Sequence, residues 1–421
     1  MSSAQIILTD RLFDGASVRE HAYVVYQHGT ITDVGARADL GERISERFAQ
    51  PIVLPPDATL LPGLINMHTH LSFSAAPTVF DDARSESDAL KMIRIVENMH
   101  AALAVGITTV RDCGTWPHLA LPARDAVMRG LLPGPRIIAS GAVTTTGGHC
   151  WYCATEADSE DEVRKAVRAH VKDGVDFIKL FATGGNTTPG SDALICQYTE
   201  AQLCAASEEA RKAGRRTAVH AHAEEGVRRS IAAAVTTIEH CSLQNEHGIG
   251  WNEQMVGDIA AKGIYVCPTV FRGVTQYFND PSYQPDARAE QFAKRLQQRL
   301  QLTRRLADHG VRLICGNDAG VSHCHIRDYP GDLVLMAQGS GLAPAQVLKS
   351  ATSVAAAALG RGDIGTVAAG KAADLLAVQG NPLDDIKNIH RTTMVIAAGK
   401  TITLKTSSPK TSSPKTSSPK T

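Results

Sequence analysis

Residues 61–70 read LPGLINMHTH, an apolar run that ends in two histidines separated by one residue. The run Leu64–Met67 has the length and composition of a buried strand. Side chains two positions apart on a strand face the same side, so His68 and His70 would point together from its carboxyl end. Neutral imidazole binds zinc and similar metals well. The segment therefore predicts part of a metal site, although an ordinary polar pair on a strand would give the same pattern.

Seven more apolar runs follow within residues 60–359, and amphipathic segments separate them. One of these segments begins with Ser159 and Glu162, whose spacing is that of a capping box and marks a helix start. Thr199 and Gln202 repeat the signature in another segment. Strands that alternate with helices over about 300 residues predict an α/β fold, a (β/α)₈ TIM barrel, with a doubly wound sheet as the alternative. The eight predicted strands are Leu64–Met67, Ile107–Arg111, Arg136–Ser140, Asp176–Leu180, Thr217–His222, Thr237–Cys241, Ile264–Thr269 and Arg312–Asp318.

The two ends of the chain contain short strands instead of this alternation. Neither residues 1–59 nor residues 360–405 could bury a core alone. Together they predict one small β-sandwich domain built from both termini. The predicted strands are Gln5–Thr9, Ala22–Tyr26, Thr30–Val34, Leu375–Val378 and Thr393–Ala397.

Residues 406–421 differ from the rest, because they repeat SSPKT three times without an apolar residue. A proline in every repeat and the lack of apolar side chains predict a disordered tail. The repeat is compatible with a natural extension and with an expression artefact.

Lys179 lies inside the apolar run Asp176–Leu180. A buried lysine is costly unless it is paired or chemically altered. Its amine loses its proton readily when buried, and a neutral amine can take up carbon dioxide to form a carbamate that bridges two metals. The ordinary interpretation is a lysine that pairs with a carboxylate or extends its amine to solvent.

Three further strand ends carry residues that bind metals. His220 and His222 share one face of the fifth predicted strand, and His240 lies near the end of the sixth. Asp318 ends the eighth predicted strand, where an aspartate more often caps a helix or forms a turn. Since five strand ends carry ligand-type residues, and barrel enzymes keep their sites at this end, the sequence predicts a metal centre there.

With these residues the sequence resembles the amidohydrolase superfamily. The similar subgroup contains imidazolonepropionase-like proteins, metal-dependent Xaa-dipeptidases and hydrolases of carbamates and phenylureas. The resemblance covers residues 4–400 and extends to the spacing of Lys179, His220 and His240. It implies a hydrolase that binds one or two divalent metals, zinc first, with manganese or cobalt as alternatives.

The resemblance also implies individual roles. His68 and His70 would bind the more buried metal with Asp318, whereas His220 and His240 would bind the second metal. Lys179 would be the carbamylated bridge between them.

The expected reaction is cleavage of an amide-type C–N bond in an amide, urea or carbamate, including N-aryl compounds. A metal-bound hydroxide would attack the carbonyl carbon. Asp318 would take the proton from the water and pass it to the leaving nitrogen. His149 and His222 are candidates for hydrogen bonds to the carbonyl oxygen, although a structural hydrogen bond fits them almost as well.

One departure from the subgroup bears on the substrate. The carboxylate-reading dipeptidases resemble one another in an aromatic residue directly after the fifth-strand histidine and an arginine soon after it. Here Ala221 follows His220, and Arg228 and Arg229 lie on a predicted helix of unknown facing. The difference favours a neutral amide, urea or carbamate over a substrate with a free carboxylate.

Phe271, Tyr277 and Phe278 offer an apolar wall for an aryl group, although packing in a core or lid fits equally.

Three other functions compete with this prediction. An Xaa-dipeptidase or prolidase-like enzyme is the first alternative. A mononuclear deaminase is the second, against which stand Lys179 and Ala223, since similar deaminases carry a glutamate three residues after the histidine. A scaffold without catalytic activity is the third, but such a protein is expected to lose its ligands.

The composition limits the partners. The chain has 43 basic and 43 acidic residues, so no positive excess attracts nucleic acid or an anionic membrane. No run of about 18 apolar residues predicts a membrane span. Nine cysteines, an odd number, and no apparent signal peptide predict free thiols in the cytoplasm. The expected partners are a small-molecule substrate and, by resemblance, further copies of the chain.

Overall fold

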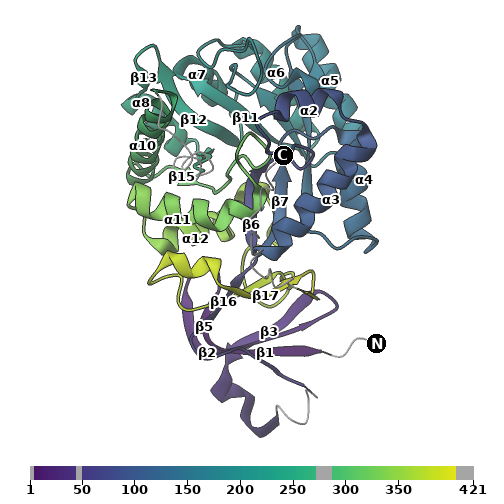
Figure 1. The fold of residues 1–421 in the computed structure, drawn as a ribbon, viewed down its shortest axis with the longest axis vertical. Coiled ribbons are helices and arrows are strands. Elements are labelled where there is room, and N and C mark those ends of the chain that lie inside the picture. The colour runs from purple at the N-terminus through teal and green to yellow at the C-terminus, as the bar shows by residue number, and fades with distance from the viewer. Residues whose placement is uncertain (1–3, 44–49, 272–286, 404–421) are drawn as a thin grey trace, which may run out of the picture.

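Two sheets organise the computed structural model, which describes residues 4–43, 50–271 and 287–403 (Figure 1). Helices surround one sheet, and strands from both ends of the chain form the other below it. The predicted disorder of residues 406–421 lies outside the described residues, as do the predicted wall residues Tyr277 and Phe278.

The central sheet is curled, and its main strands are parallel. They lie in sequence order across the sheet, which differs from a doubly wound sheet, where the order reverses. Each predicted apolar run corresponds to one strand. These strands are β6 (Leu64–Thr69), β7 (Ile107–Asp112), β8 (Arg136–Thr144), β10 (Phe177–Phe181), β11 (Arg216–Ala223), β12 (Thr237–Asn245), β14 (Tyr265–Cys267) and β15 (Arg312–Leu313). Two short strands, β9 (Thr155–Glu156) and β13 (Gly248–Ile249), pair with β8 and β12.

The last strand is shorter than the predicted Arg312–Asp318, because the ladder ends at Leu313. The segment beyond it still joins the two ends of the sheet. The N–H of Met67 on β6 donates to the carbonyl of Cys315 at 2.9 Å, and the N–H of Asp318 donates to the carbonyl of His68 at 3.0 Å. Asp318 therefore lies beside β6, on irregular backbone instead of a strand.

The helices lie on the outside of the central sheet (Figure 1). Both predicted capping boxes are present, at Ser159 before α5 and at Thr199 before α6. The α-helices are α2 (Val79–Ser85), α3 (Asp88–Ala104), α4 (Pro117–Met128), α5 (Glu160–Asp173), α6 (Glu200–Lys212), α7 (Glu224–Ala232), α8 (Glu253–Ala261), α10 (Ala287–Asp308), α11 (Tyr329–Ser340), α12 (Pro344–Ser350) and α13 (Ser353–Leu359). Short 3₁₀ turns are η1 (Arg37–Arg43), η2 (Trp151–Cys153), η3 (Ile326–Asp328) and η4 (Ile386–His390). Among the described helices none has the length and apolar character required to cross a membrane.

Strands from both ends of the chain pair in the second sheet. Strand β16 pairs antiparallel with β5, which in turn pairs parallel with β1. Its buried residues form an apolar core of their own, which includes Ile7, Leu12, Val24, Leu375 and Ile396. The strands are β1 (Gln5–Phe13), β2 (Val18–Gln27), β3 (Thr30–Ala36), β4 (Ile52–Val53), β5 (Ala58–Pro62), β16 (Leu375–Gln379), β17 (Thr392–Ala397) and β18 (Lys400–Ile402).

Gly63 connects the two sheets, since β5 ends at Pro62 and β6 begins at Leu64. A side chain at this position would collide with the side chain of Thr108. The N–H of Gly63 donates to the carbonyl of Asp374 at 2.8 Å. The glycine therefore permits a close crossing that anchors the first strand of the central sheet.

Candidate metal centre

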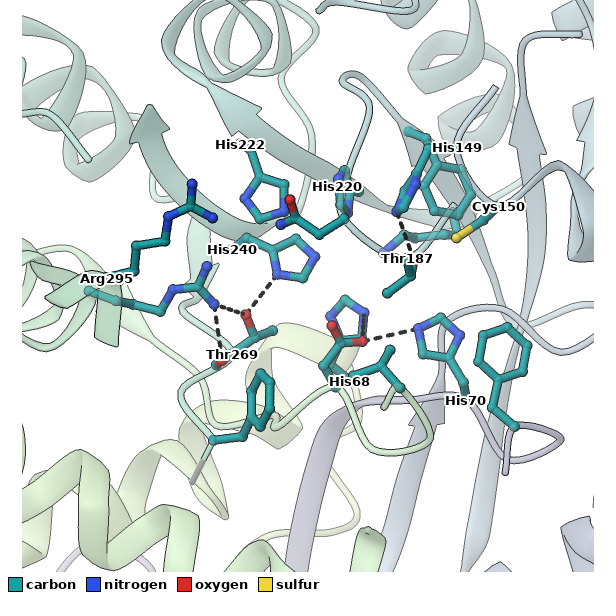
Figure 2. Close-up of a pocket in the computed structure, with 18 of the residues that line it drawn as sticks. His68, His70, His149, Cys150, Thr187, His220, His222, His240, Thr269 and Arg295 are labelled. Atoms are coloured by element: carbon teal, nitrogen blue, oxygen red, sulfur yellow. Dashed lines mark hydrogen bonds and ion pairs between the residues drawn. The ribbon is translucent and has the colours of Figure 1, made fainter. Parts of the chain in front are cut away.

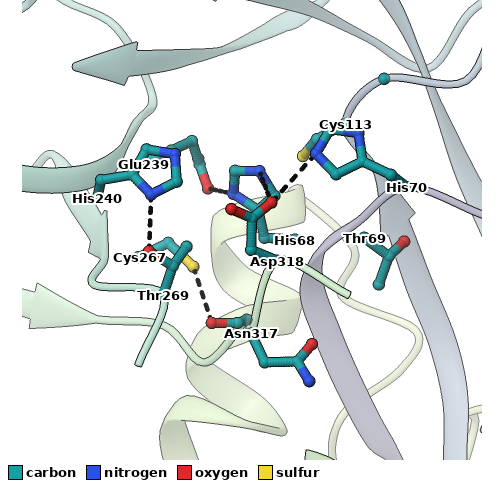
Figure 3. A network of polar contacts seen from close by, with 12 residues as sticks. His68, Thr69, His70, Cys113, Glu239, His240, Cys267, Thr269, Asn317 and Asp318 are labelled. Carbon is teal, nitrogen blue, oxygen red and sulfur yellow. Dashed lines mark hydrogen bonds and ion pairs between the residues drawn. The ribbon is translucent and has the colours of Figure 1, made fainter. Parts of the chain in front are cut away.

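His68 near the end of β6 and His70 directly after the strand point toward the same carboxylate (Figure 3). Oδ1 of Asp318 lies 3.3 Å from Nε2 of His68 and 3.1 Å from Nε2 of His70. Burial works to raise the pKa of Asp318, but the two imidazoles outweigh it and hold the pKa well below its usual range. The structure thus brings an anionic carboxylate and two imidazoles together, although they are about 250 residues apart.

Glu239 fixes the other nitrogen of His68. Nδ1 of His68 lies 2.8 Å from Oε2 of this fully buried glutamate, whose Oε1 accepts from Nη2 of Arg111 at 2.6 Å and from the Thr237 hydroxyl at 2.5 Å. Burial works to raise the pKa of Glu239, but Arg111 and His68 lower it by more. The carboxylate is therefore charged. The carboxylate accepts a hydrogen bond from Nδ1–H of His68, which leaves the Nε2 lone pair available for a metal. The sequence analysis missed Glu239, whose signal was an acidic residue inside a buried apolar strand.

Three imidazoles from β11 and β12 form a second cluster. Potential ligand atoms of His220, His222 and His240 lie within 4.8 Å of one another, and all three side chains are buried. Burial is the main cause that lowers the pKa of each well below the usual range, and neighbouring imidazoles lower it further. The rings are therefore neutral, which is the form that binds a metal.

Hydrogen bonds orient these rings. Nδ1 of His240 lies 2.7 Å from Oγ1 of Thr269, whose hydroxyl donates to the carbonyl of Pro268. His240 therefore donates through Nδ1 and keeps a lone pair on Nε2. Nε2 of His220 donates to the carbonyl of Gly184 at 3.0 Å, so its lone pair is on Nδ1.

Lys179 on β10 is completely buried and borders the same pocket. Its Nζ lies 5.2 Å from the ring centre of Phe181. Within the described part of the chain the amine forms no hydrogen bond or ion pair, and burial prevents it from reaching solvent. The geometry thus fits neither of the two ordinary interpretations of this lysine.

All the predicted site residues border one pocket of about 300 Å³ (Figure 2). His149 lies opposite His220, with ring centres 4.7 Å apart, and its Nε2 lies 3.4 Å from the hydroxyl of Thr187. Apolar side chains form much of the remaining wall; among them are Phe73, Phe181, Phe271, Phe292, Leu296 and Val321. The pocket therefore combines a polar floor with apolar walls.

The backbone is strained at three of these positions. His240, Thr269 and Asp318 have positive φ angles of 67°, 47° and 64°, a region that residues other than glycine rarely adopt. Such conformations are concentrated at functional sites, where the surrounding structure enforces them. Here they turn the backbone of all three residues away from regular strand geometry.

The sequence of residues 59–402 matches the profile of the amidohydrolase family. The chain belongs to this family.

Similar proteins agree with this assignment. Ochratoxinase of Aspergillus niger is 26% identical over 412 residues, which cover 89% of this amidohydrolase and 80% of the relative. A Xaa-Pro dipeptidase, solved with methionine in its active site, is 29% identical, with a TM-score of 0.82 over 95% of this chain and 100% of the other. Phenylurea hydrolase B, at 21% identity and a TM-score of 0.77, covers 96% and 97% and shares the fold. The predicted family is confirmed, and with it a hydrolase that acts on C–N bonds.

The arginines of the amidohydrolase pocket are not those considered from the sequence. Arg228 and Arg229 on α7 are absent from its wall, and both form ion pairs with Glu225. Arg295 and Arg299 on α10 line the pocket instead. The sequence offered no signal for them, because nothing local specifies which face of α10 meets the site.

Proposed function

We propose that this amidohydrolase uses a binuclear metal centre. His68, His70 and Asp318 would hold one divalent ion, and His220 with His240 would hold the other. Lys179, as a carbamate, would be a ligand of both. Zinc is the first candidate, and manganese or cobalt suits the same nitrogen and oxygen ligands.

One observation carries the proposal: neutral imidazoles and a charged carboxylate converge on one point. Ligand atoms of His68, His240 and Asp318 lie within 4.8 Å of one another, which is close enough for one metal ion to contact all three. His240 belongs to both clusters and so connects them.

Bound metal would supply the Lewis acidity that polarises the scissile carbonyl and acidifies a water molecule. The chain itself moves the protons. Asp318 Oδ1 takes a proton from the attacking water and delivers it to the departing nitrogen, because an unprotonated amine is a poor leaving group. His149 and His222 face the pocket and donate to the carbonyl oxygen as negative charge develops on it.

The predicted organisation remains part of the proposal. Residues 60–359 form a closed (β/α)₈ barrel, supported by the hydrogen bonds of Met67 and Asp318 across the two ends of the sheet. Residues 1–59 and 360–405 form the small β-sandwich, and 406–421 the tail. All nine cysteines are free, which agrees with a reducing cytoplasm. Self-association stays a prediction from the resemblance.

Elemental analysis of the purified protein tests the centre. We expect about two divalent ions per chain. Lys179→Ala should lose a large part of the metal and nearly all amide, urea and carbamate hydrolysis. Lys172→Ala, an exposed lysine on α5, is the matched control and should retain both. About one ion per chain, unchanged in Lys179→Ala, would contradict the bridge and favour a mononuclear enzyme.

A further inference from the structure

Two guanidinium groups form one side of the pocket. Arg295 and Arg299 are four residues apart on α10 and so share one face of the helix. Both border the cavity that contains the histidines, together with Leu296 of the same helix. Figure 2 places Arg295 on the same side of the pocket as Thr269 and His240.

Arg299 is anchored next to the metal ligands. Its Nη1 donates to the carbonyl and to Oγ1 of Thr269 at 3.3 and 3.2 Å, and the same Oγ1 accepts from His240. One edge of the guanidinium is therefore held in place. Its Nη2 and Nε have no hydrogen-bond partner among the described residues.

Neither arginine has a carboxylate partner within the described ranges. The contrast with other arginines is clear, since Arg111 pairs with Glu239, and Arg228 pairs with Glu225. The charge of Asp318 attracts Arg299 from beyond ion-pair distance but does not offset the cost of burying the guanidinium, and an anionic ligand in contact would reduce that cost. Arg295 is exposed and borders the pocket, whereas Arg299 lies half-buried beside Thr269.

We propose that Arg295 and Arg299 bind a carboxylate of the substrate, so that the preferred substrate is an N-acyl amino acid whose amine half carries a free carboxylate. The assignment rests on the proposed hydrolase function and reverses the substrate preference inferred from the sequence. A guanidinium fork matches a carboxylate in two parallel hydrogen bonds.

The rest of the pocket agrees with such a ligand. The carboxylate of an N-acyl amino acid is separated from the scissile nitrogen by one carbon, so its receptor must lie close to the metal centre. Thr269 provides that closeness, because it contacts both Arg299 and His240. The neighbouring Phe271, Phe292 and Leu296 are apolar and suit a side chain of leucine or phenylalanine type.

Matched pairs of substrates test this proposal. We would compare N-benzoyl-leucine with its neutral, nearly isosteric carboxamide, and repeat the comparison with phenylalanine, on metal-loaded enzyme. The wild type should cleave each acid with a kcat/KM about 10- to 100-fold higher than that of its carboxamide. Arg299→Met and Arg295→Gln should lower kcat/KM for the acid much more than for the carboxamide, mainly through KM, so that the preference falls below about threefold.

Controls separate this role from support of the metal. Metal content of both variants must equal that of the wild type, and Arg299→Lys should recover only part of the preference because it lacks the fork. Arg228→Gln, on α7 outside the pocket, should behave as the wild type. Equal cleavage of acid and carboxamide, or a preference that survives both substitutions, would overturn the carboxylate site and leave the hydrolase intact. No turnover of any amide, urea or carbamate by enzyme with full metal would overturn the proposed function and this site with it.

Discussion

Nδ1 of His68 lies 2.8 Å from Oε2 of Glu239, so a ligand-type histidine on β6 is oriented by a carboxylate on β12, a strand that is not its neighbour in the sheet. The carboxylate is itself held by Arg111 from a third strand. Strands β6, β7 and β12 thus meet in one buried chain of charges beneath the pocket.

Glu239→Gln should weaken metal binding about 10- to 100-fold, because the neutral amide no longer fixes the Nδ1 proton of His68. It also leaves the buried Arg111 without a counter-ion, which should cost about 3–5 kcal/mol of folding free energy. Competition with a metal chelator and urea denaturation measure the two effects. Glu239→Asp should restore part of each. Unchanged metal affinity in Glu239→Gln would show that the contact does not orient the ligand.

Asp318→Asn should lower kcat by about 10²- to 10⁴-fold, since an amide cannot accept the proton from water. Some metal should remain bound, because His68 and His70 are untouched. Steady-state kinetics with elemental analysis on one preparation measures both. Asp328→Asn, a change outside the pocket wall, is a matched control. Activity equal to that of the wild type would rule out the role of Asp318 as the proton carrier.

His222 and His240 lie in one cluster but should have different functions. His240→Ala should lose about one metal ion per chain, whereas His222→Ala should keep the metal and lose about 10²- to 10³-fold in kcat, as when a donor to the carbonyl oxygen is removed. Metal content set against kcat for the two variants gives the answer. Loss of metal in His222→Ala would instead make His222 a ligand.

The metal-free protein should become less stable in mild acid. Burial first, and then neighbouring positive groups, lowers the pKa of His220, His222 and His240 well below the ordinary 6.5. As the pH falls through about 6.5, the unfolded chain takes up protons on these imidazoles while the folded chain does not, so protons favour unfolding. The free energy of unfolding should therefore be highest above pH about 7 and fall toward pH about 5.

Urea denaturation of chelator-treated protein across this range tests the prediction. His222→Asn should reduce the slope, because it removes one imidazole that the unfolded state protonates. His247→Asn, an exposed histidine, should leave the slope unchanged. A free energy of unfolding that stays constant or rises as the pH falls would show that these imidazoles are charged in the folded protein.

The sequence by itself identified the eight strands and the strand ends that carry the candidate ligands. Both are local properties: apolar runs define buried strands, and alternation places His68 with His70 and His220 with His222 on one face. The family followed from the same residues. The predicted eighth strand, Arg312–Asp318, was too long, because the local residue pattern does not show that the hydrogen-bonded ladder stops at Leu313. The left-handed backbone of Asp318 is imposed by its hydrogen bond to β6 and by its place between two imidazoles.

Only the tertiary structure decided which charges meet. Glu239 and Arg111 are 128 positions apart, and no local pattern indicates that each neutralises the other. The facing of α10 depends on how the helix packs, so the sequence could not bring Arg295 and Arg299 into the pocket or keep Arg228 out of it. A few neighbouring residues determine the alternation of a strand. The pairing of charges depends instead on burial and on distances that exist only after distant segments have packed together.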